Sequence, residues 1–356
     1  MTAPGLEVGN VSLRLGSFAL RDVSFHAAPG EILVLLGANG AGKSVCLETI
    51  AGFHRPSSGR ILIAGRDVTE LQPEKRRIAF LVQDFALFPH LSIEKNVAIG
   101  CEPRSDVVAL HAMLARFGIA HLARSLPEHL SPGEKQRAAL ARALASRPSL
   151  YLFDEPFAAL DAATAENLRV ELAAFMRRSE VPSVFVTHDR AEALTLADRI
   201  AIVDGGAIRQ HGSAAEVLAR PNSVAIARFL GIENLLEGQV TAEAGDAFRV
   251  SVGGIGISLA ERGAAPPSPH RVTLCIRAEN VHLLPPQSAA QPNRLRARVV
   301  DLRRSGPLWK VTLDCGFSLV AYALPQTARE CNLAPGSAVD AEIDARDVHV
   351  LPAARA

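Results

Sequence analysis

One glycine-rich segment constrains the fold of this chain more than any other feature of its sequence. The segment Gly37-Ala-Asn-Gly-Ala-Gly-Lys43-Ser44 fits the pattern G-x-x-x-x-G-K-[ST]. It directly follows the apolar run Ile32–Leu36 and directly precedes the helical pattern Lys43–Ala51. In that context glycines let backbone N–H groups curl around phosphate oxygens, and a lysine adds positive charge. The sequence therefore predicts a phosphate-binding loop made of Gly37, Ala38, Asn39, Gly40, Ala41, Gly42, Lys43 and Ser44.

A second strand is expected to end in two carboxylates. The apolar run Leu150–Phe153 is followed by Asp154 and Glu155. Beside a phosphate-binding loop, Asp154 and the Ser44 hydroxyl can hold Mg²⁺, and Glu155 is placed to polarise an attacking water. A solvated turn is the alternative for two adjacent acids at a strand end. The presence of the glycine-rich loop favours the catalytic interpretation.

Three separate signals mark a helix start near residue 131. Ser131 is a favourable N-cap, Pro132 suits the first helical position, and Glu134 completes the Ser-x-x-Glu pattern of a capping box. A capped helix start attracts anions as well, because its free N–H groups and its dipole point outward. Most capping boxes only cap, so this pattern alone does not predict a ligand site.

The order of these motifs resembles that of the ATP-binding cassette (ABC) ATPases. Leu130–Arg137 is similar to the signature motif of the family, Gln83 to its Q-loop glutamine, Ala158–Asp161 to its D-loop and His188 to its switch histidine. The resemblance extends over about residues 6–232. It implies an ATPase that uses ATP and Mg²⁺, with Gln83 as a further metal ligand and with Glu155 and His188 as catalytic residues.

The same resemblance implies a homodimer in which two cassettes pair head to tail around two ATP molecules. Each phosphate-binding loop then faces the signature helix of the other copy, which makes Ser131 and Gly133 nucleotide-binding residues. Two positions depart from the family pattern. Pro132 replaces a glycine and lacks an N–H donor. Leu15 takes the place of the aromatic residue that usually stacks on adenine, with Phe18 as a nearby substitute.

Composition excludes several classes of function. The chain has 38 Lys+Arg against 37 Asp+Glu, a net charge of +1 and no long basic run, which argues against a nucleic-acid partner. No apolar stretch approaches the roughly 18–20 residues of a transmembrane helix, and no secretory signal is visible. The five cysteines are scattered without a metal or disulfide pattern. We expect a reduced chain that, by the resemblance, lies peripherally at the cytoplasmic face of the inner membrane.

The kinds of secondary structure that the sequence predicts change near residue 232. Before it, short apolar strands alternate with helical patterns, which predicts an α/β P-loop NTPase domain, the ABC cassette, at residues 1–232. After it, short strands separated by glycine and proline predict a small all-β, OB-like domain at residues 233–356.

The predicted β-domain looks duplicated. Asn234–Val240 is echoed by Asn293–Val299, and Val281–Pro285 by Val348–Pro352. We therefore expect two related OB-like modules, at about residues 234–285 and 293–352. A chance similarity between strand-like segments is the alternative.

The segment after Gln83 resembles that of ABC importers for oxyanions, ferric ion, polyamines and sugars. There it receives a helix of the permease, for which Phe85, Leu87 and Phe88 would supply an apolar socket, unless they are core residues. The resemblance implies integral membrane permease subunits and, indirectly, an extracytoplasmic solute-binding protein. The C-terminal region resembles the TOBE modules of these importers, and its second half their molybdate-binding Mop version. We expect molybdate, tungstate or a related oxyanion as solute, with sulfate, ferric ion, polyamine and sugar as alternatives.

Two further hypotheses stay open. A soluble, non-transport ABC ATPase usually fuses two cassettes or inserts long coiled coils, and neither is visible. The C-terminal region is also a candidate for binding a regulatory oxyanion, because Arg303-Arg304-Ser305-Gly306 and Lys310 offer hydroxyl, N–H and cationic donors. A solvated basic turn in a domain that only makes dimer contacts is the alternative.

Overall fold

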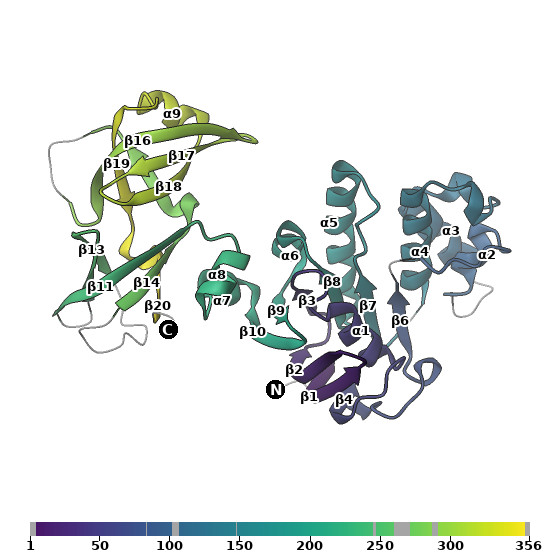
Figure 1. The fold of residues 1–356 in the computed structure, drawn as a ribbon. Helices are drawn as coiled ribbons and strands as arrows, with labels where there is room; N and C mark the ends of the chain where they lie inside the picture. Colours follow the sequence, from purple (N-terminus) through teal and green to yellow (C-terminus); the bar gives the residue numbers. More distant parts are fainter. Residues whose placement is uncertain are drawn as a thin grey trace. The chain divides into compact units, whose positions relative to one another are not determined.

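Contacts divide the chain into two compact units, residues 1–217 and residues 218–356 (Figure 1). The structure is a computed structural model that describes residues 5–82, 84–101, 107–146, 148–244, 247–259, 271–286 and 291–352. The division between the compact units lies N-terminal to the domain boundary suggested by the sequence. The limits at residues 232 and 233 stay a prediction.

A mostly parallel sheet forms the centre of the first unit. Its strands are β3 (Ile32–Leu36), β6 (Ile78–Leu81), β7 (Leu150–Asp154), β8 (Ser183–Thr187), β9 (Arg199–Asp204) and β10 (Ala207–Ser213). They follow the order β10-β9-β3-β8-β7-β6, and only the β10–β9 pair is antiparallel. Strands β3, β7 and β8 are buried along their whole length, as expected for strands of a sheet covered on both faces. The predicted α/β class is confirmed.

Helices lie between these strands in the chain and after the last of them. They are α1 (Lys43–Ala51), α2 (Ile93–Ala98), α3 (Val107–Arg116), α4 (Pro132–Ala145), α5 (Ala162–Ser179), α6 (Arg190–Leu196) and α7 (Ala214–Ala219), with 3₁₀ turns η1 (Pro73–Lys75), η2 (Ala120–Leu122) and η3 (Pro127–His129). Between β6 and β7 in the chain, α2, α3 and α4 pack on one another. Of the helices within the described ranges, none has the length and hydropathy that a membrane span requires.

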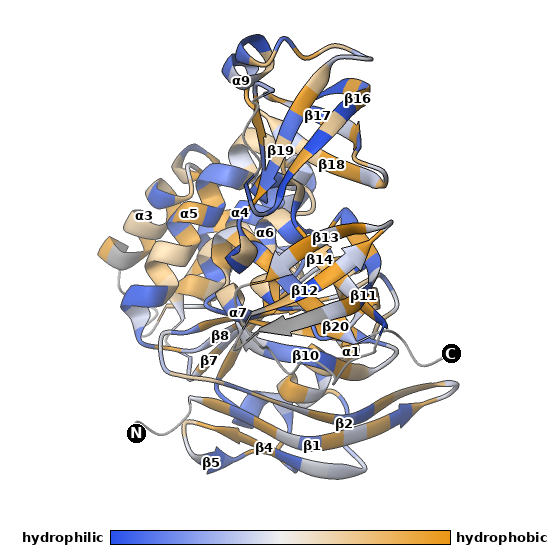
Figure 2. Cartoon of the chain, turned by 90° about the vertical axis from the view of Figure 1, so that its left-hand side faces the viewer, coloured by the Kyte–Doolittle hydropathy of each residue, from blue (hydrophilic) through white to orange (hydrophobic). Residues whose placement is uncertain are grey.

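A second, antiparallel sheet packs on α1 and the central sheet. It consists of β1 (Leu6–Leu15), β2 (Phe18–Ala27), β4 (Ser58–Ile63) and β5 (Arg66–Asp67), in the order β2-β1-β4-β5. Polar and apolar residues alternate along β1 and β2 (Figure 2). The apolar set, including Leu6 and Phe25, joins Leu33 of β3 and Leu47 of α1 in one hydrophobic cluster. This sheet therefore anchors the helix that follows the glycine-rich loop.

In its described residues, the second unit contains two five-stranded antiparallel sheets. Their strands are β11 (Asn234–Ala244), β12 (Ala247–Val252), β13 (Ile255–Leu259), β14 (Arg271–Ile276), β15 (Val281–Leu284), β16 (Arg294–Ser305), β17 (Leu308–Asp314), β18 (Ser318–Ala323), β19 (Ala338–Ile343) and β20 (Val348–Pro352). Short helices α8 (Val224–Phe229) and α9 (Pro325–Glu330) and 3₁₀ turns η4 (Ala278–Asn280) and η5 (Ala345–Asp347) complete it. The predicted all-β character is confirmed.

The two sheets repeat one topology but exchange their last strands. One sheet has the order β13-β12-β11-β14-β20 and the other the order β18-β17-β16-β19-β15. Strand β15 comes from the first sequence repeat but pairs with β19, as Val281 lies opposite Ile343. Strand β20 comes from the second repeat but pairs with β14, as Val348 lies opposite Ile276. Each sheet is therefore completed by the other repeat.

Two asparagines link the repeats a second time. Asn234 accepts a hydrogen bond from Val320 N at 2.6 Å and donates to Val320 O at 2.9 Å. Asn293 makes the equivalent pair of bonds with Ser258, both at 2.7 Å. Each buried amide thus satisfies the outer edge of a strand in the opposite sheet, β18 or β13, much as a further strand would.

Candidate active site

The glycine-rich loop and the predicted catalytic residues meet at one edge of the central sheet. Strands β3, β8 and β7 are adjacent and parallel, so their carboxyl ends lie together. Gly37 follows β3, His188 follows β8, and Asp154 ends β7. The topology therefore brings together three motifs that are far apart in the sequence.

Two positions of the loop accept only glycine. A Cβ on Gly37 would lie 2.3 Å from the Val203 carbonyl oxygen, and one on Gly42 would lie 2.4 Å from Cζ of Phe18. Gly42 also has a φ of 104°, in the region that side chains disfavour. These contacts explain why the loop curls tightly before α1.

The Lys43 ammonium lies across the loop. It donates to the carbonyl oxygens of Gly37 at 2.8 Å and Ala38 at 2.9 Å. Burial lowers the pKa of Lys43, and the nearby carboxylates of Glu155 and Asp154 offset part of that effect. A desolvated cation held at a loop of backbone N–H groups is suited to phosphate charge.

Asp154 and Ser44 offer a pair of hard oxygen ligands. The Ser44 hydroxyl hydrogen-bonds to the Asp154 carboxylate, which is 8% exposed. Burial raises the pKa of Asp154, and the charges of Glu155 and Glu48 add to this. Within the described residues there is no cluster of three or more His, Cys, Asp or Glu side chains suited to a metal. One carboxylate beside a hydroxyl fits Mg²⁺, which usually takes few protein ligands and completes its shell with phosphates and water.

Glu155 and His188 face each other. His188 Nδ1 lies 2.9 Å from Glu155 Oε1, and the imidazole is 53% exposed. Glu155 has a φ of 47°, a left-handed conformation that is uncommon outside glycine. Its N–H donates to the Val186 carbonyl of β8 at 3.0 Å, which holds the strained turn against the sheet. The two predicted catalytic side chains are therefore in direct contact.

The predicted capping box of α4 is present. Ser131 N donates to Glu134 Oε2 at 2.8 Å, and Glu134 N donates to Ser131 Oγ at 3.4 Å. These bonds lower the pKa of Glu134. Pro132 occupies the first helical position, and Ser131 is exposed at the helix start, with Gly133 partly exposed. The helix start is thus preformed, with Ser131 turned to solvent.

The remaining family motifs are only partly described. Gln83, the predicted Q-loop metal ligand, lies outside the described residues. In the D-loop, Asp161 caps α5 by accepting a hydrogen bond from Thr164 N at 3.0 Å. Phe18 places its ring against Gly42 of the phosphate-binding loop, whereas Leu15 packs at the margin of the core beneath β1 and β2.

The segment that follows Gln83 has an unusual backbone. Phe85 and Ala86 both have positive φ, 62° and 45°. Arg142 of α4 donates to the Ala86 carbonyl at 2.7 Å and to the Phe85 carbonyl at 3.0 Å. Phe88 is 41% exposed and lies under the Arg142 guanidinium, and neither Phe85 nor Leu87 is fully buried. The core alternative is therefore wrong for the exposed Phe88, whereas Phe85 and Leu87 are partly buried.

The sequence does not predict the contact of Arg142 with the carbonyls of residues 85 and 86, because no local spacing connects these positions. The signal that was available is indirect. An arginine in an otherwise alanine- and leucine-rich helix needs a polar partner if it is to be buried. Its partners here are backbone carbonyls of a distant segment, and burial lowers the pKa of Arg142.

The basic turn proposed for oxyanion binding is engaged within the chain. Arg303 pairs with Asp301 at 2.6 Å, and Lys310 pairs with Glu233 at 2.6 Å. Arg304 lies over the Trp309 ring at 5.6 Å. Each cation thus has a neighbour of its own within the chain, and oxyanion binding at this turn stays a prediction.

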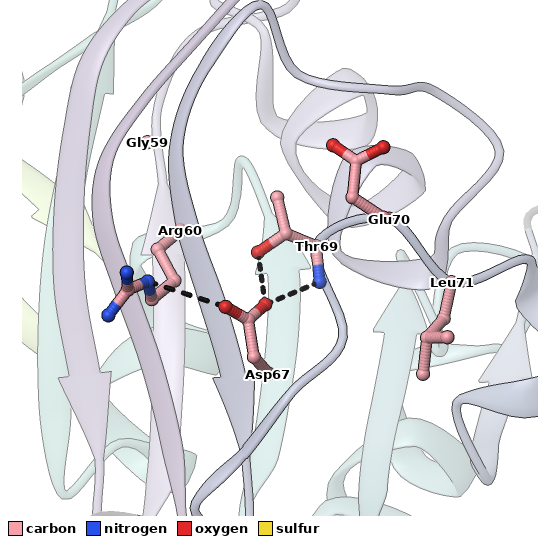
Figure 3. A pocket seen from close by; sticks show the side chains of 6 residues that line it. All are labelled: Gly59, Arg60, Asp67, Thr69, Glu70 and Leu71. Atoms are coloured by element: carbon pink, nitrogen blue, oxygen red, sulfur yellow. Dashed lines mark hydrogen bonds and ion pairs between the residues drawn. The ribbon is translucent and has the colours of Figure 1, made fainter.

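A surface hollow of about 360 Å³ lies away from the catalytic motifs, beside β4 and β5 (Figure 3). Asp67 forms an ion pair with Arg60 at 3.3 Å and accepts a hydrogen bond from the Thr69 hydroxyl at 2.6 Å. Arg60, Asp67 and Thr69 are thus bonded to one another, whereas Glu70 pairs with Arg55, which does not line the hollow. It contains none of the predicted site residues.

Known proteins with similar sequences are import ATP-binding proteins. The molybdate/tungstate import ATP-binding protein WtpC of Pyrococcus horikoshii is 36% identical, over 98% of this chain and 100% of its own length. The sulfate/thiosulfate import ATP-binding protein CysA 2 of Chromobacterium violaceum is 37% identical, over 98% and 95%. The putative 2-aminoethylphosphonate import ATP-binding protein PhnT of Salmonella typhimurium is 38% identical, over 87% and 85%.

Family profiles and solved structures agree with these relatives. A profile for ABC transporters matches residues 20–158, and one for TOBE domains matches residues 274–351. A dimeric ATP-binding cassette in a post-hydrolysis state with ADP and Pi is similar with a TM-score of 0.53 and 27% identity, over 58% of this chain and 98% of that one. Together with the ordered motifs at the sheet edge, these similarities show that the chain is an ATPase and an import ATP-binding subunit of the ABC transporter family.

Proposed function

We propose that ATP hydrolysis in this chain depends on five side chains at the edge of the central sheet: Lys43, Ser44, Asp154, Glu155 and His188. The observation that carries this proposal is their convergence, with the His188–Glu155 contact of 2.9 Å next to the Ser44–Asp154 hydrogen bond. Lys43 and the loop N–H groups, with Asn39 and Gly40 at the loop's exposed tip, bind phosphates. Glu155 orients the attacking water, and His188 contacts the γ-phosphate.

Ser44, Asp154 and Gln83 would hold Mg²⁺, which supplies positive charge to the phosphates. The chain's own contribution is mostly positioning and charge. The strained Glu155 turn holds its carboxylate beside His188, where it would orient the water, and the desolvated Lys43 meets the phosphate charge at little further cost in reorganisation.

The second step of the proposal concerns assembly. Two copies pair through their cassettes, so that Ser131 and Gly133 of one copy reach the nucleotide of the other. The exposed Ser131 at a preformed helix start supports this role, because it is available to a second chain. The subunit lies peripherally at the cytoplasmic face of the inner membrane. Phe85, Leu87 and Phe88 contact a permease there.

The hydrolytic roles are tested by two substitutions. We expect Glu155→Gln to bind ATP and to stall turnover, because only the positioned water is lost. Lys43→Ala should instead weaken nucleotide binding itself. Steady-state phosphate release and calorimetric ATP binding separate the two effects. Near-normal hydrolysis by Glu155→Gln, or unchanged ATP affinity of Lys43→Ala, would contradict the assignment.

For the solute, we favour molybdate or tungstate, delivered by an extracytoplasmic binding protein. The similarity to WtpC over 98% of this chain and the full length of WtpC supports this. Sulfate and 2-aminoethylphosphonate are the alternatives, because CysA 2 and PhnT are similar to the chain at nearly equal identity. Ferric ion, polyamines and sugars are less favoured because none of these relatives carries them in its name.

Uptake measurements distinguish these solutes. A strain lacking the gene should lose high-affinity accumulation of molybdenum or tungsten, measured as cell-associated metal at nanomolar supply. The wild-type gene should restore accumulation, and the Glu155→Gln gene should not. Normal metal accumulation together with loss of sulfate or phosphonate uptake would assign the subunit to that oxyanion instead.

A further inference from the structure

A buried ion pair connects the two segments that carry Glu155 and His188. Arg169 of α5 donates from Nη2 to Glu192 Oε1 of α6 at 3.0 Å, and the two side chains are only 13% and 9% exposed. The other carboxylate oxygen accepts a hydrogen bond from the Thr187 hydroxyl at 2.6 Å. Because both oxygens are engaged, the orientation of the Glu192 carboxylate is fixed.

Thr187 fixes the backbone on both sides of His188. It ends β8, and its hydroxyl oxygen accepts a hydrogen bond from Asp189 N at 2.9 Å while donating to Glu192. Glu192 stands where a capping box would send its carboxylate back to the N–H of Asp189. Here the hydroxyl takes that N–H, and the carboxylate turns inward to Arg169. The imidazole itself stays half exposed on a tethered backbone.

Arg169 extends the connection to the segment after Glu155. Its guanidinium lies 5.5 Å from the centre of the Phe157 ring, and Phe157 is 2% exposed. Phe157 comes two residues after Glu155, whose left-handed backbone persists only if its surroundings hold it. A single ion pair therefore reaches the supports of both catalytic candidates.

Stability alone does not explain this arrangement. Buried ion pairs can often be replaced by apolar residues of similar volume without loss of stability. What such a pair contributes here is direction, because each of its hydrogen bonds orients a group beside a catalytic side chain. We propose that Thr187, Glu192 and Arg169 are positioning residues that hold the side chains of Glu155 and His188 in the relative positions that ATP hydrolysis requires. This inference rests on the proposed roles of Glu155 and His188.

The first test removes one hydroxyl. We expect Thr187→Val to lower kcat about tenfold and to leave KM for ATP within about twofold, because the tether acts on hydrolysis rather than on phosphate binding. Thr187→Ser keeps the hydroxyl and should restore kcat to within about twofold of the unmodified protein. A Thr187→Val protein with normal kcat, or a Thr187→Ser protein as slow as the valine variant, would overturn the proposal.

Two matched controls use neighbouring groups. Thr195 lies on α6 as well, but its hydroxyl donates to Ala191 O of the same helix at 2.9 Å. Thr195→Val should leave kcat unchanged. Glu166 also pairs with Arg169, at 3.1 Å, but is 58% exposed, so Glu166→Gln should leave kcat unchanged too. If kcat falls as far in these controls as in Thr187→Val, the effect is a general loss of structure and the proposal is wrong.

The ion pair is tested by replacing both partners. Removing one partner leaves a buried charge and threatens the fold, so Arg169→Met and Glu192→Leu are combined. We expect this double variant to keep its melting temperature within a few degrees and its KM within about twofold, while kcat falls about tenfold. Normal kcat in a folded double variant would show that the pair has no positioning role.

A third arm separates this inference from the proposed roles. In a His188→Ala background, Thr187→Val should cause no further loss of turnover, because the residue whose backbone Thr187 tethers is already disabled. A further tenfold loss would contradict the inference. If Glu155→Gln and His188→Ala both hydrolyse ATP normally, the proposed roles themselves fail. If both are inactive and Thr187→Val is normal, only the positioning inference fails.

Discussion

Asp154 carries a cost in stability that its proposed function explains. Burial raises its pKa, so the carboxyl group holds a proton more tightly in the folded protein than in the unfolded chain. For a carboxyl group with a raised folded pKa, the stabilising contribution is complete below the ordinary value of about 3.9 and is lost as the pH rises through the folded value. At neutral pH the ionised carboxylate therefore destabilises the nucleotide-free protein.

We expect Asp154→Asn to melt at a higher temperature than the unmodified protein at pH 7 without nucleotide. The amide keeps the shape of the side chain and removes the buried charge. The difference should shrink as the pH falls toward 4. With Mg²⁺ and ATP, the order should reverse, because the charged carboxylate binds the metal more strongly than the neutral amide does. A lower melting temperature of the variant at pH 7 without nucleotide would contradict this reading of Asp154.

Leu15 provides a test of base recognition. It is partly exposed where the family has a stacking aromatic residue. Stacking on a base contributes about 1–3 kcal/mol, so Leu15→Trp should tighten ATP binding by roughly tenfold. Leu15→Met serves as the control, with unchanged affinity. If the tryptophan has no effect and Phe18→Leu weakens binding, the base contacts Phe18 instead.

At the scale of single residues, the sequence predicts which residues lie at the candidate site better than it predicts their backbone and side-chain conformations. Lys43, Ser44 and Asp154 stand where their motif predicts. The left-handed backbone of Glu155 and the inward turn of the Glu192 carboxylate were not predicted. Both depend on partners supplied by β8 and α5, which no local pattern specifies.

Individual elements differ in how strongly the sequence specifies them. Helix α4 begins at the predicted capping box, and β3 and α1 match their predicted bounds, because caps and apolar runs are local signals. The antiparallel strands β1, β2 and β4 were not predicted. The alternation of polar and apolar residues in these strands is also common in exposed segments. It identifies a strand only when the surface that buries its apolar face is known.

The strained segment after Gln83 gives a prediction at this scale. Ala86 has a φ of 45°, and a left-handed conformation costs a residue other than glycine about 1–2 kcal/mol. Ala86→Gly should therefore raise the free energy of unfolding by about 1 kcal/mol, after the greater freedom of glycine in the unfolded chain is included. Denaturant titration measures the change.

The same substitution in a helix supplies the control. Ala112 is exposed in α3, where replacement by glycine should lower the free energy of unfolding by about 1 kcal/mol. If both variants lose stability, Arg142 holds residues 85 and 86 in a conformation that glycine does not relieve, and the strain argument is wrong.

For the molecule as a whole, the sequence predicts the class of each part and the internal duplication. It does not predict which repeat completes which sheet. The similar segments Val281–Pro285 and Val348–Pro352 became the exchanged strands β15 and β20. Either segment matches either sheet in its pattern, and only the length and path of the connections decide the pairing.

Strand exchange predicts the behaviour of a cleaved chain. A protease site inserted between β15 and β16 should give two fragments that stay together through gel filtration in the absence of denaturant. The exchanged strands and the reciprocal asparagine bonds hold them. A chain truncated after β15 should instead lose its soluble β-unit, because β14 then lacks β20. Separation of the cleaved fragments would contradict the interlock.

The reciprocal asparagines also limit how such a unit evolves. Asn234 and Asn293 each form hydrogen bonds with an edge strand of the other repeat, so neither repeat is structurally independent of the other. Recombination between two homologous genes at a point between the repeats would place each asparagine against the edge strand of a different protein. Each sheet would also receive its last strand from a different protein. Lineages should therefore exchange residues 234–352 as one block. A substitution at either asparagine should therefore be accompanied by a change at the edge that it bonds, whereas the outer surfaces of the two repeats are free to differ.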